Sequence, residues 1–404
     1  MSKSKSIILI CLVAFSISAA DYSSLKISWE DKKNVSTASF QGNFNKQIIS
    51  GYKNDIHTPA DTTAAAALIN GCKFSWQPTW RFQGAGTVWL NAHQSNDCSL
   101  LTLVENSQNS RRERSSILVL MNLFNARVVN FALLNGIDII NFCPIPDNNK
   151  IIALVKSPPT EYSNKNSYKL ILFSQYDGKK IAAGEVFQYE LNTMQVSNNG
   201  AFLLAAPENQ SGVILYRTDN LNKILQRIKT PGTVTVAAVQ GEGFLLGGRN
   251  FIVKLDKEGS SWKISRCYKV PRRFKPDKMV SCGSRNFAVI ATGGPGFYYN
   301  SGDFVKLSDS CGAALAWDPK KRQIILTRQR NSGIIVVDAQ APVLDKQLIL
   351  PNKIKPRTRG RVTGLFPDPG GKAFFALDDK GTMMKFFKAG RRWKKNIIFT
   401  AQDI

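Results

Sequence analysis

The sequence predicts an all-β fold built from repeated four-stranded antiparallel meanders, and three observations support this. The first is the stretch 362–399, which holds four short apolar runs separated by turn clusters rich in Gly, Pro, Asp and basic residues. Runs this short indicate strands, because an amphipathic helix needs a longer pattern that these turn residues would interrupt. Four consecutive strands joined by tight turns form one meander.

The second observation is a turn that recurs between the first and second strands of each expected meander. It precedes apolar runs such as Ile-Ile-Ala-Leu and Ala-Phe-Phe-Ala, and its copies lie at 96–98, 147–150, 197–200, 241–243, 283–286, 318–322 and 368–372. The last residues of successive copies are 36 to 52 residues apart, close to the roughly 40–50 residues of a propeller blade. Seven turns predict seven meanders.

The third observation is an aspartate at the end of expected third strands, at Asp177, Asp219, Asp256 and Asp338. An Asp side chain can accept a hydrogen bond from the backbone of the turn that follows it. We therefore expect these four aspartates to stabilise turns rather than to bind a ligand.

From Gly84 to the C-terminus the chain resembles the WD-repeat-like β-propellers. The Gly-His and Trp-Asp dipeptides of true WD repeats are missing from their expected places, and Trp317-Asp318 ends a first strand instead of a third. The resemblance therefore concerns the fold and no specific family. It implies a seven-bladed β-propeller, with eight blades as the alternative count. Loops between second and third strands would share one face with the connections between blades.

Three segments are expected along the chain. Residues 1–20 have the features of a signal peptide, with Lys3 and Lys5, an apolar stretch at 7–17 and the small residues Ser18-Ala19-Ala20. Residues 21–83 form an irregular N-terminal segment or a degenerate blade, and residues 84–404 form the propeller. No later stretch is apolar for the roughly 20 residues that cross a bilayer, so we expect a secreted or periplasmic protein.

The charge is strongly positive, with 54 Lys and Arg against 29 Asp and Glu and a formal net charge of +25. On an exported protein this surplus favours an acidic glycan or an acidic protein partner, although it serves solubility equally well. The propeller topology places much of it on one face. The residues predicted to bind such a partner are Arg111, Arg112, Arg114, Arg272, Arg273, Lys275, Arg328, Arg330, Lys353, Lys355, Arg357, Arg359 and Arg361. Arg249 and Lys278 map to the same face, whereas Lys320, Lys321 and Arg322 map to the opposite one.

The last five of these predicted residues lie at every second position of the run 353–361. In an extended segment they would project to one side. Such a comb suits a polyanion with repeating charges, because arginines can form paired hydrogen bonds with sulfate, phosphate or carboxylate.

Motifs for catalysis are scarce. His57 and His93 are the only histidines, which excludes a His-rich metal site, and we expect both to be structural. The glycine-rich stretches 293–296 and 369–372 lack the spacing of a phosphate-binding loop. We therefore predict no catalytic residues, no metal, no cofactor and no specific nucleic acid partner.

Two alternatives stay open beside the binding module. Some propellers are lactonases or hydrolases with carboxylates at the axis, and Asp138, Glu190 and Asp309 near blade starts could supply them. The chain could also be a structural subunit of an envelope complex. The sequence fixes neither the partner nor the oligomeric state.

Six cysteines follow the expected signal peptide. An even number in an oxidising compartment permits disulfides, and the absence of a C-x-x-C pair argues against a redox dithiol or a zinc site. Cys72 and Cys98 are the candidate disulfide. We expect Cys143, Cys267 and Cys282 to be small buried side chains in strands.

Overall fold

The structure, a computed structural model, describes residues 24–31, 34–41, 72–76, 88–95, 100–108, 114–124, 127–135, 137–146, 148–157, 166–300, 302–329, 333–340, 348–349, 361–379, 382–390 and 392–399. The chain divides into two compact units. One comprises Gly84–Thr400, and the other comprises Met1–Gln83 with Ala401–Ile404.

The smaller unit contains an antiparallel sheet of β1 (Ser24–Asp31), β2 (Asn34–Gln41) and β3 (Cys72–Trp76). Its strand order is β2-β1-β3. This order differs from that of a meander blade, in which strands pair in sequence order.

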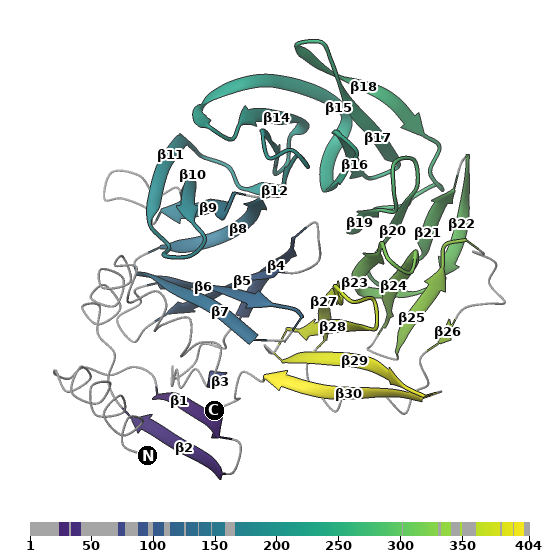
Figure 1. The fold of residues 1–404 in the computed structure, drawn as a ribbon. Coiled ribbons are helices and arrows are strands. Elements are labelled where there is room, and N and C mark those ends of the chain that lie inside the picture. Colours follow the sequence, from purple (N-terminus) through teal and green to yellow (C-terminus); the bar gives the residue numbers. More distant parts are fainter. Residues whose placement is uncertain are drawn as a thin grey trace. The chain divides into compact units, whose positions relative to one another are not determined.

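In the Gly84–Thr400 unit, by contrast, all strands pair with their neighbours in sequence order (Figure 1). The first two sheets are β4 (Val88–Gln94), β5 (Leu100–Gln108), β6 (Arg114–Asn122) and β7 (Arg127–Asn135), then β8 (Asp138–Ile145), β9 (Lys150–Ser157), β10 (Ser167–Ser174) and β11 (Lys180–Phe187). The last three are β19 (Lys278–Ser281), β20 (Phe287–Ile290), β21 (Gly296–Asn300) and β22 (Asp303–Ser308), then β23 (Cys311–Asp318), β24 (Gln323–Arg328), β25 (Ile334–Asp338) and β26 (Leu348–Ile349), then β27 (Val362–Pro367), β28 (Ala373–Asp378), β29 (Met383–Ala389) and β30 (Arg392–Phe399).

Between these lies a seven-stranded sheet that consists of two meanders sharing one strand. It comprises β12 (Leu191–Val196), β13 (Phe202–Pro207), β14 (Ser211–Arg217), β15 (Asn220–Gln240), β16 (Gly243–Gly248), β17 (Phe251–Glu258) and β18 (Ser261–Tyr268). The first part of β15, up to Thr233, pairs with β14, and the part from Val234 onward pairs with β16. Strand β15 is thus the fourth strand of one meander and the first strand of the next.

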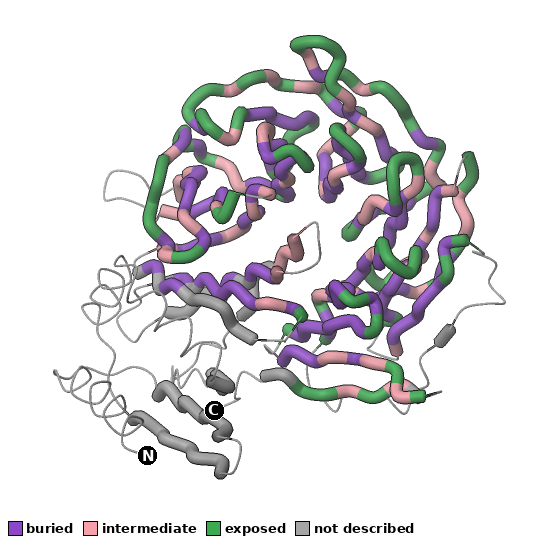
Figure 2. Tube along the Cα trace, viewed as in Figure 1, coloured by how far each residue is buried: buried purple, intermediate pink, exposed green. Residues whose placement is uncertain are grey.

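In the Gly84–Thr400 unit the core lies between successive sheets, because these sheets bury both of their faces. In β9, Ile151 and Ala153 pack toward the β4–β7 sheet, whereas Ile152 and Leu154 pack toward the sheet that begins with β12. The same alternation holds in β13, β16, β20 and β24. Figure 2 shows that exposed residues gather on outer strands and turns. The central positions of β9, β13, β16, β20 and β24 are therefore apolar, since side chains toward both neighbouring sheets are buried.

The first strands of successive meanders lie next to one another, so the turns of the Gly84–Thr400 unit fall on two sides of it. The first strand of each sheet contacts that of the next, and β27 contacts β4. We call the side with the turns between first and second strands the turn face. The connection face, at the opposite strand ends, carries the turns between second and third strands and the connections between successive meanders.

Side chains near the ends of first strands join successive meanders. On the turn face, Asn198 Nδ2 donates to Gly241 O at 2.7 Å, and Gln240 Nε2 donates to Asn286 O at 3.0 Å. Toward the connection face, Asn192 Nδ2 donates to Val234 O at 3.1 Å.

The turn predictions are confirmed in part. All seven predicted turns between first and second strands fall between paired strands. Asp177 and Asp338 accept hydrogen bonds from Lys179 N at 3.0 Å and Gln340 N at 2.9 Å, as expected. The expectation is wrong for Asp256, because β17 continues to Glu258 and the Asp256 carboxylate pairs with Lys254 instead. The Asp219 carboxylate pairs with Arg217.

The cysteine predictions also hold in part. Cys143 and Cys282 are buried, whereas Cys267 is exposed. Cys267 lies on β18, an outer strand that has neighbours on one side only. Cys72 lies in β3, and Cys98 lies outside the described residues, so the candidate disulfide stays a prediction.

His93 lies where the first two sheets meet. Its ring makes an edge contact with Phe142 of β8, with ring centroids 4.9 Å apart. The Nε2 atom is buried and has no hydrogen-bond partner among the described residues. Burial lowers the pKa of His93 to about 4, and the charge of Lys278 acts in the same direction.

This environment predicts that His93 makes the fold acid-sensitive. The His93 imidazole is protonated near pH 6.5 in the unfolded chain, but only near pH 4 in the folded chain. The free energy of unfolding should therefore fall as the pH is lowered through this window, by roughly 2–3 kcal/mol at the acid end. Urea denaturation between pH 7 and pH 4.5 measures this, and a His93→Gln variant should show a flatter profile by about one proton. Parallel profiles would contradict the assignment.

Candidate functional site

Five exposed cations cluster on the connection face, between β18 and β19 and at the neighbouring turn between β16 and β17. We call this group the basic cluster. Its members are Arg249, Lys269, Arg272, Arg273 and Lys275. Arg249, Arg272, Arg273 and Lys275 were expected from the sequence to share one face, and the strand order places them together.

The backbone that carries the basic cluster is held by hydrogen bonds. Asn250 N donates to Phe274 O at 2.9 Å, which joins the Arg249–Asn250 turn to the 271–274 turn. Phe274 N donates to Pro271 O at 3.3 Å and closes that second turn. Thr235 Oγ1 donates to Pro276 O at 2.8 Å, which ties the connection to β15. The cations thus extend from two turns that are fixed to each other.

Apolar side chains anchor the same segment from below. Phe274 is buried and makes an edge contact with Phe297, with ring centroids 5.2 Å apart. Pro276 is buried and packs over Gly247, where an added Cβ would lie 2.9 Å from the Pro276 ring. Buried and exposed residues alternate along 273–276, and Arg272 is also exposed, so the charged side chains face solvent.

Both turns contain a residue in the left-handed region. Asn250 has φ 66° and Arg273 has φ 63°. Asn enters this region readily, but an arginine there is uncommon and costs on the order of 1 kcal/mol. The local fold thus keeps an arginine where glycine would fit with less strain.

The basic cluster has no ion-pair partner in the part of the chain that the structure describes. The adjacent Asp277 carboxylate instead accepts a hydrogen bond from Thr292 N at 2.7 Å. Lys278, which begins β19, has its pKa lowered by desolvation, with Asp277 opposing the shift. Like charges that close together repel one another, so the packing of the connection must offset that repulsion.

The other predicted binding residues are spread along the connection face or fall outside the described residues. Arg328 ends β24 and is exposed. Its neighbour Gln329 lies beside Gly293. Gly293 follows Thr292, whose N donates a hydrogen bond to Asp277. Arg361 is exposed before β27, where its N donates to Asp379 Oδ1 at 2.7 Å. Arg114 begins β6, but its side chain is not described. Arg111, Arg112, Arg330, Lys353, Lys355, Arg357 and Arg359 lie outside the described residues.

Sequence reasoning missed two features of this face. Lys269 was not expected to join the cluster. Acidic residues also gather elsewhere on the same face: Asp138, Glu190 and Glu208 all contribute to a raised pKa of Tyr168, after desolvation, and the Tyr168 hydroxyl donates to Glu190 Oε2 at 3.3 Å. The connection face is therefore divided between an acidic and a basic region.

The carboxylates considered for an enzyme are not all together. Asp138 and Glu190 lie near Tyr168, whereas Asp309 pairs with Lys306 on the β19–β22 sheet. Within the described part of the chain, no three His, Cys, Asp or Glu side chains are arranged to hold a metal ion. The described residues also include no helix with the length and hydrophobicity needed to cross a membrane.

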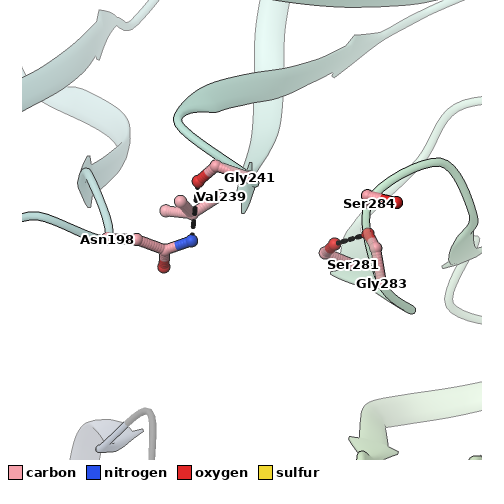
Figure 3. A pocket seen from close by; sticks show the side chains of 6 residues that line it. All are labelled: Asn198, Val239, Gly241, Ser281, Gly283 and Ser284. Atoms are coloured by element: carbon pink, nitrogen blue, oxygen red, sulfur yellow. Dashed lines mark hydrogen bonds between the residues drawn. The ribbon is translucent and has the colours of Figure 1, made fainter.

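The turn face carries an open pocket of about 430 Å³ between three successive turns. Figure 3 shows Asn198, Val239, Gly241, Ser281, Gly283 and Ser284 around it. Two of its polar groups already bond to neighbours, since Asn198 Nδ2 donates to Gly241 O and Ser281 Oγ donates to Gly283 O at 2.8 Å. The lining is uncharged, so this pocket does not share the chemistry of the basic cluster.

No known protein family matches the sequence, and no curated protein matches it. Among solved structures, the chain is similar to one described as "Crystal Structure of Mitotic Checkpoint Complex", at 12% sequence identity and a TM-score of 0.49. That similarity covers 63% of this chain and 75% of the other. Such low identity gives no basis for transferring a partner.

The left-handed position of Arg273 predicts opposite effects for two neighbouring substitutions. Arg273→Gly relieves backbone strain and should leave the free energy of unfolding unchanged or raise it by up to about 1 kcal/mol. Arg272→Gly removes the same charge at an ordinary φ. It should lower the free energy of unfolding by about 0.5–1 kcal/mol, because glycine adds conformational freedom to the unfolded chain. Urea denaturation of both variants checks this, and equal losses would count against the strained conformation.

Proposed function

We propose that the Gly84–Thr400 unit is a seven-bladed β-propeller that acts as a binding module and engages an acidic macromolecule through its connection face. The observation that carries this proposal is the basic cluster. Its five exposed cations form no ion pair with a described residue, and their backbone is fixed by hydrogen bonds and buried apolar side chains.

The blade count is supported by the pairing of the strands. The five four-stranded sheets count as five meanders, and the seven-stranded sheet contributes two that share β15. Ring closure is supported by the contact of β27 with β4 and by Gln94 Nε2, which donates to Pro367 O at 2.6 Å. These two strands are the first strands of the last and the first meander.

The binding role is supported by preorganisation. A ligand that meets fixed turns does not have to order them on binding, so little of the interaction free energy is lost. Each guanidinium can donate paired hydrogen bonds to an oxyanion, and charge-assisted bonds of this kind are about twice as strong as neutral ones.

Export is part of the same proposal. It is supported by the basic start, the apolar stretch and the small residues of 1–20. Outside the cell or in the periplasm, acidic glycans and acidic proteins are accessible partners. The run 353–361 and residues Arg111 and Arg112 are proposed to extend the same binding face.

Two variants with equal charge loss test the proposed function. The connection-face variant carries Arg249→Ser, Arg272→Ser and Arg273→Gly. The turn-face variant carries Lys320→Ser, Lys321→Ser and Arg322→Gly. The pair is matched, because each loses three positive charges and each replaces one exposed arginine of left-handed φ, which is 63° at Arg273 and 53° at Arg322.

We expect the connection-face variant to bind immobilised heparin at least tenfold more weakly at 0.15 M salt, and the turn-face variant to bind nearly as the wild type does. Loss of fixed charge-assisted contacts lowers affinity specifically, whereas loss of diffuse surface charge acts mainly through screened long-range attraction. Biosensor titration measures the affinities, and thermal denaturation checks that both variants fold. If both variants lost heparin affinity equally, the charge would act only through general electrostatic attraction, and the proposal would be wrong.

A further inference from the structure

We infer that the basic cluster selects tetrahedral oxyanions, the sulfate or phosphate esters of a polymer, over carboxylates. This inference rests on the proposed function and specifies the chemical class of its ligand. It starts from the arrangement of the three arginines within the cluster.

Arg249, Arg272 and Arg273 extend from two turns that one main-chain hydrogen bond joins. Arg249 precedes Asn250, the donor of the bond to Phe274 O, and Arg273 precedes Phe274, the acceptor. Arg249 and Arg273 are therefore each one residue away from the same 2.9 Å contact, and Arg272 is two residues away. Side chains of this length bring several guanidinium groups within reach of one anion.

The number of guanidinium groups decides which anion fits. A carboxylate has two oxygens with about four lone-pair sites, so two arginines are enough to occupy it. A sulfate or phosphate ester presents more acceptor oxygens around a tetrahedral centre, so two or three arginines can bind it together. The cluster offers more paired donors than one carboxylate can use.

Arginine rather than lysine holds the central positions. A guanidinium is planar and presents fixed pairs of donors, whereas an ammonium is a compact, strongly hydrated point charge. The two lysines, Lys269 and Lys275, lie at the ends of the 269–275 segment. They can add attraction without setting the geometry of the bound group.

A polymer fits better than a single ion, because the positive charge continues beyond the cluster. Arg328 lies two turns further along the connection face. The Asp277–Thr292 hydrogen bond leads to the turn between β20 and β21, and Gly293 of that turn lies beside Gln329, the neighbour of Arg328. Further anionic groups along one chain could engage Arg328. The acidic region around Tyr168 would repel such a chain and so keep it on the basic side.

The test compares two polymers with the same backbone and different anions. Dextran sulfate and carboxymethyl dextran of matched charge density are titrated at 0.15 M salt against the wild type and an Arg249→Lys, Arg272→Lys, Arg273→Lys variant. The lysine variant keeps the net charge and keeps a non-glycine residue at position 273. We expect the wild type to bind dextran sulfate at least fivefold more tightly than carboxymethyl dextran, and the lysine variant to lose most of that ratio.

The outcomes separate the inference from the proposed function. Equal binding of both polymers by the wild type, with loss in the connection-face variant, overturns the selectivity but leaves the proposed function standing. A ratio that the lysine variant retains also overturns the inference, because arginine geometry would then not be its cause. Binding that the connection-face and turn-face variants lose equally refutes the proposed function itself. Competition with inorganic tripolyphosphate or free sulfate then identifies which ester the cluster prefers, and displacement by either supports the inference.

Discussion

The burial of both sheet faces is the constraint on which the rest of the Gly84–Thr400 unit depends. A meander with two apolar faces cannot be stable alone, since burying a side chain such as Leu or Phe contributes roughly 1.5–3 kcal/mol and exposing it forfeits that amount. In β9, β13, β16, β20 and β24, odd and even residues belong to different interior clusters. Each sheet therefore requires a neighbour on either side, and the side-chain bonds between first strands, such as Asn192 to Val234, fix how the neighbours meet.

The basic cluster is a by-product of this packing that the protein can use. The 269–277 connection must cross from an outer strand, β18, to a first strand, β19. Phe274 and Pro276 are buried within this connection, and the residues between and around them are exposed. A connection held this firmly can tolerate adjacent arginines whose repulsion would spread a free loop apart. The charged side chains of this connection therefore contribute little to the core.

Much of the fold could be predicted from the sequence, because burial of both faces leaves a local signal. A run such as Ile-Ile-Ala-Leu next to a turn of Asp, Asn and Lys identifies a second strand without knowledge of its partners. The face of Arg249, Arg272 and Arg273 followed from topology alone. The hydrogen bond between Asn250 and Phe274 could not be predicted, because it joins turns that no local pattern relates. Asp138 and Glu190 were considered together from the sequence, but Glu208, the third carboxylate near Tyr168, was missed for the same reason. Pro231-Gly232 has the composition of a turn, yet it lies within β15.

Strand β15 has a consequence for how this unit comes apart. Since residues 220–240 hydrogen-bond to β14 at one end and to β16 at the other, neither meander can detach without breaking the pairing of the other or bending the strand at Pro231. Amide hydrogen exchange across β12–β18 should thus report one cooperative opening rather than two. The basic cluster is joined to β16–β18 and is tied to β15 through Thr235. A polyanion bound to the basic cluster would therefore make the opening of both meanders less favourable, including residues that it does not contact.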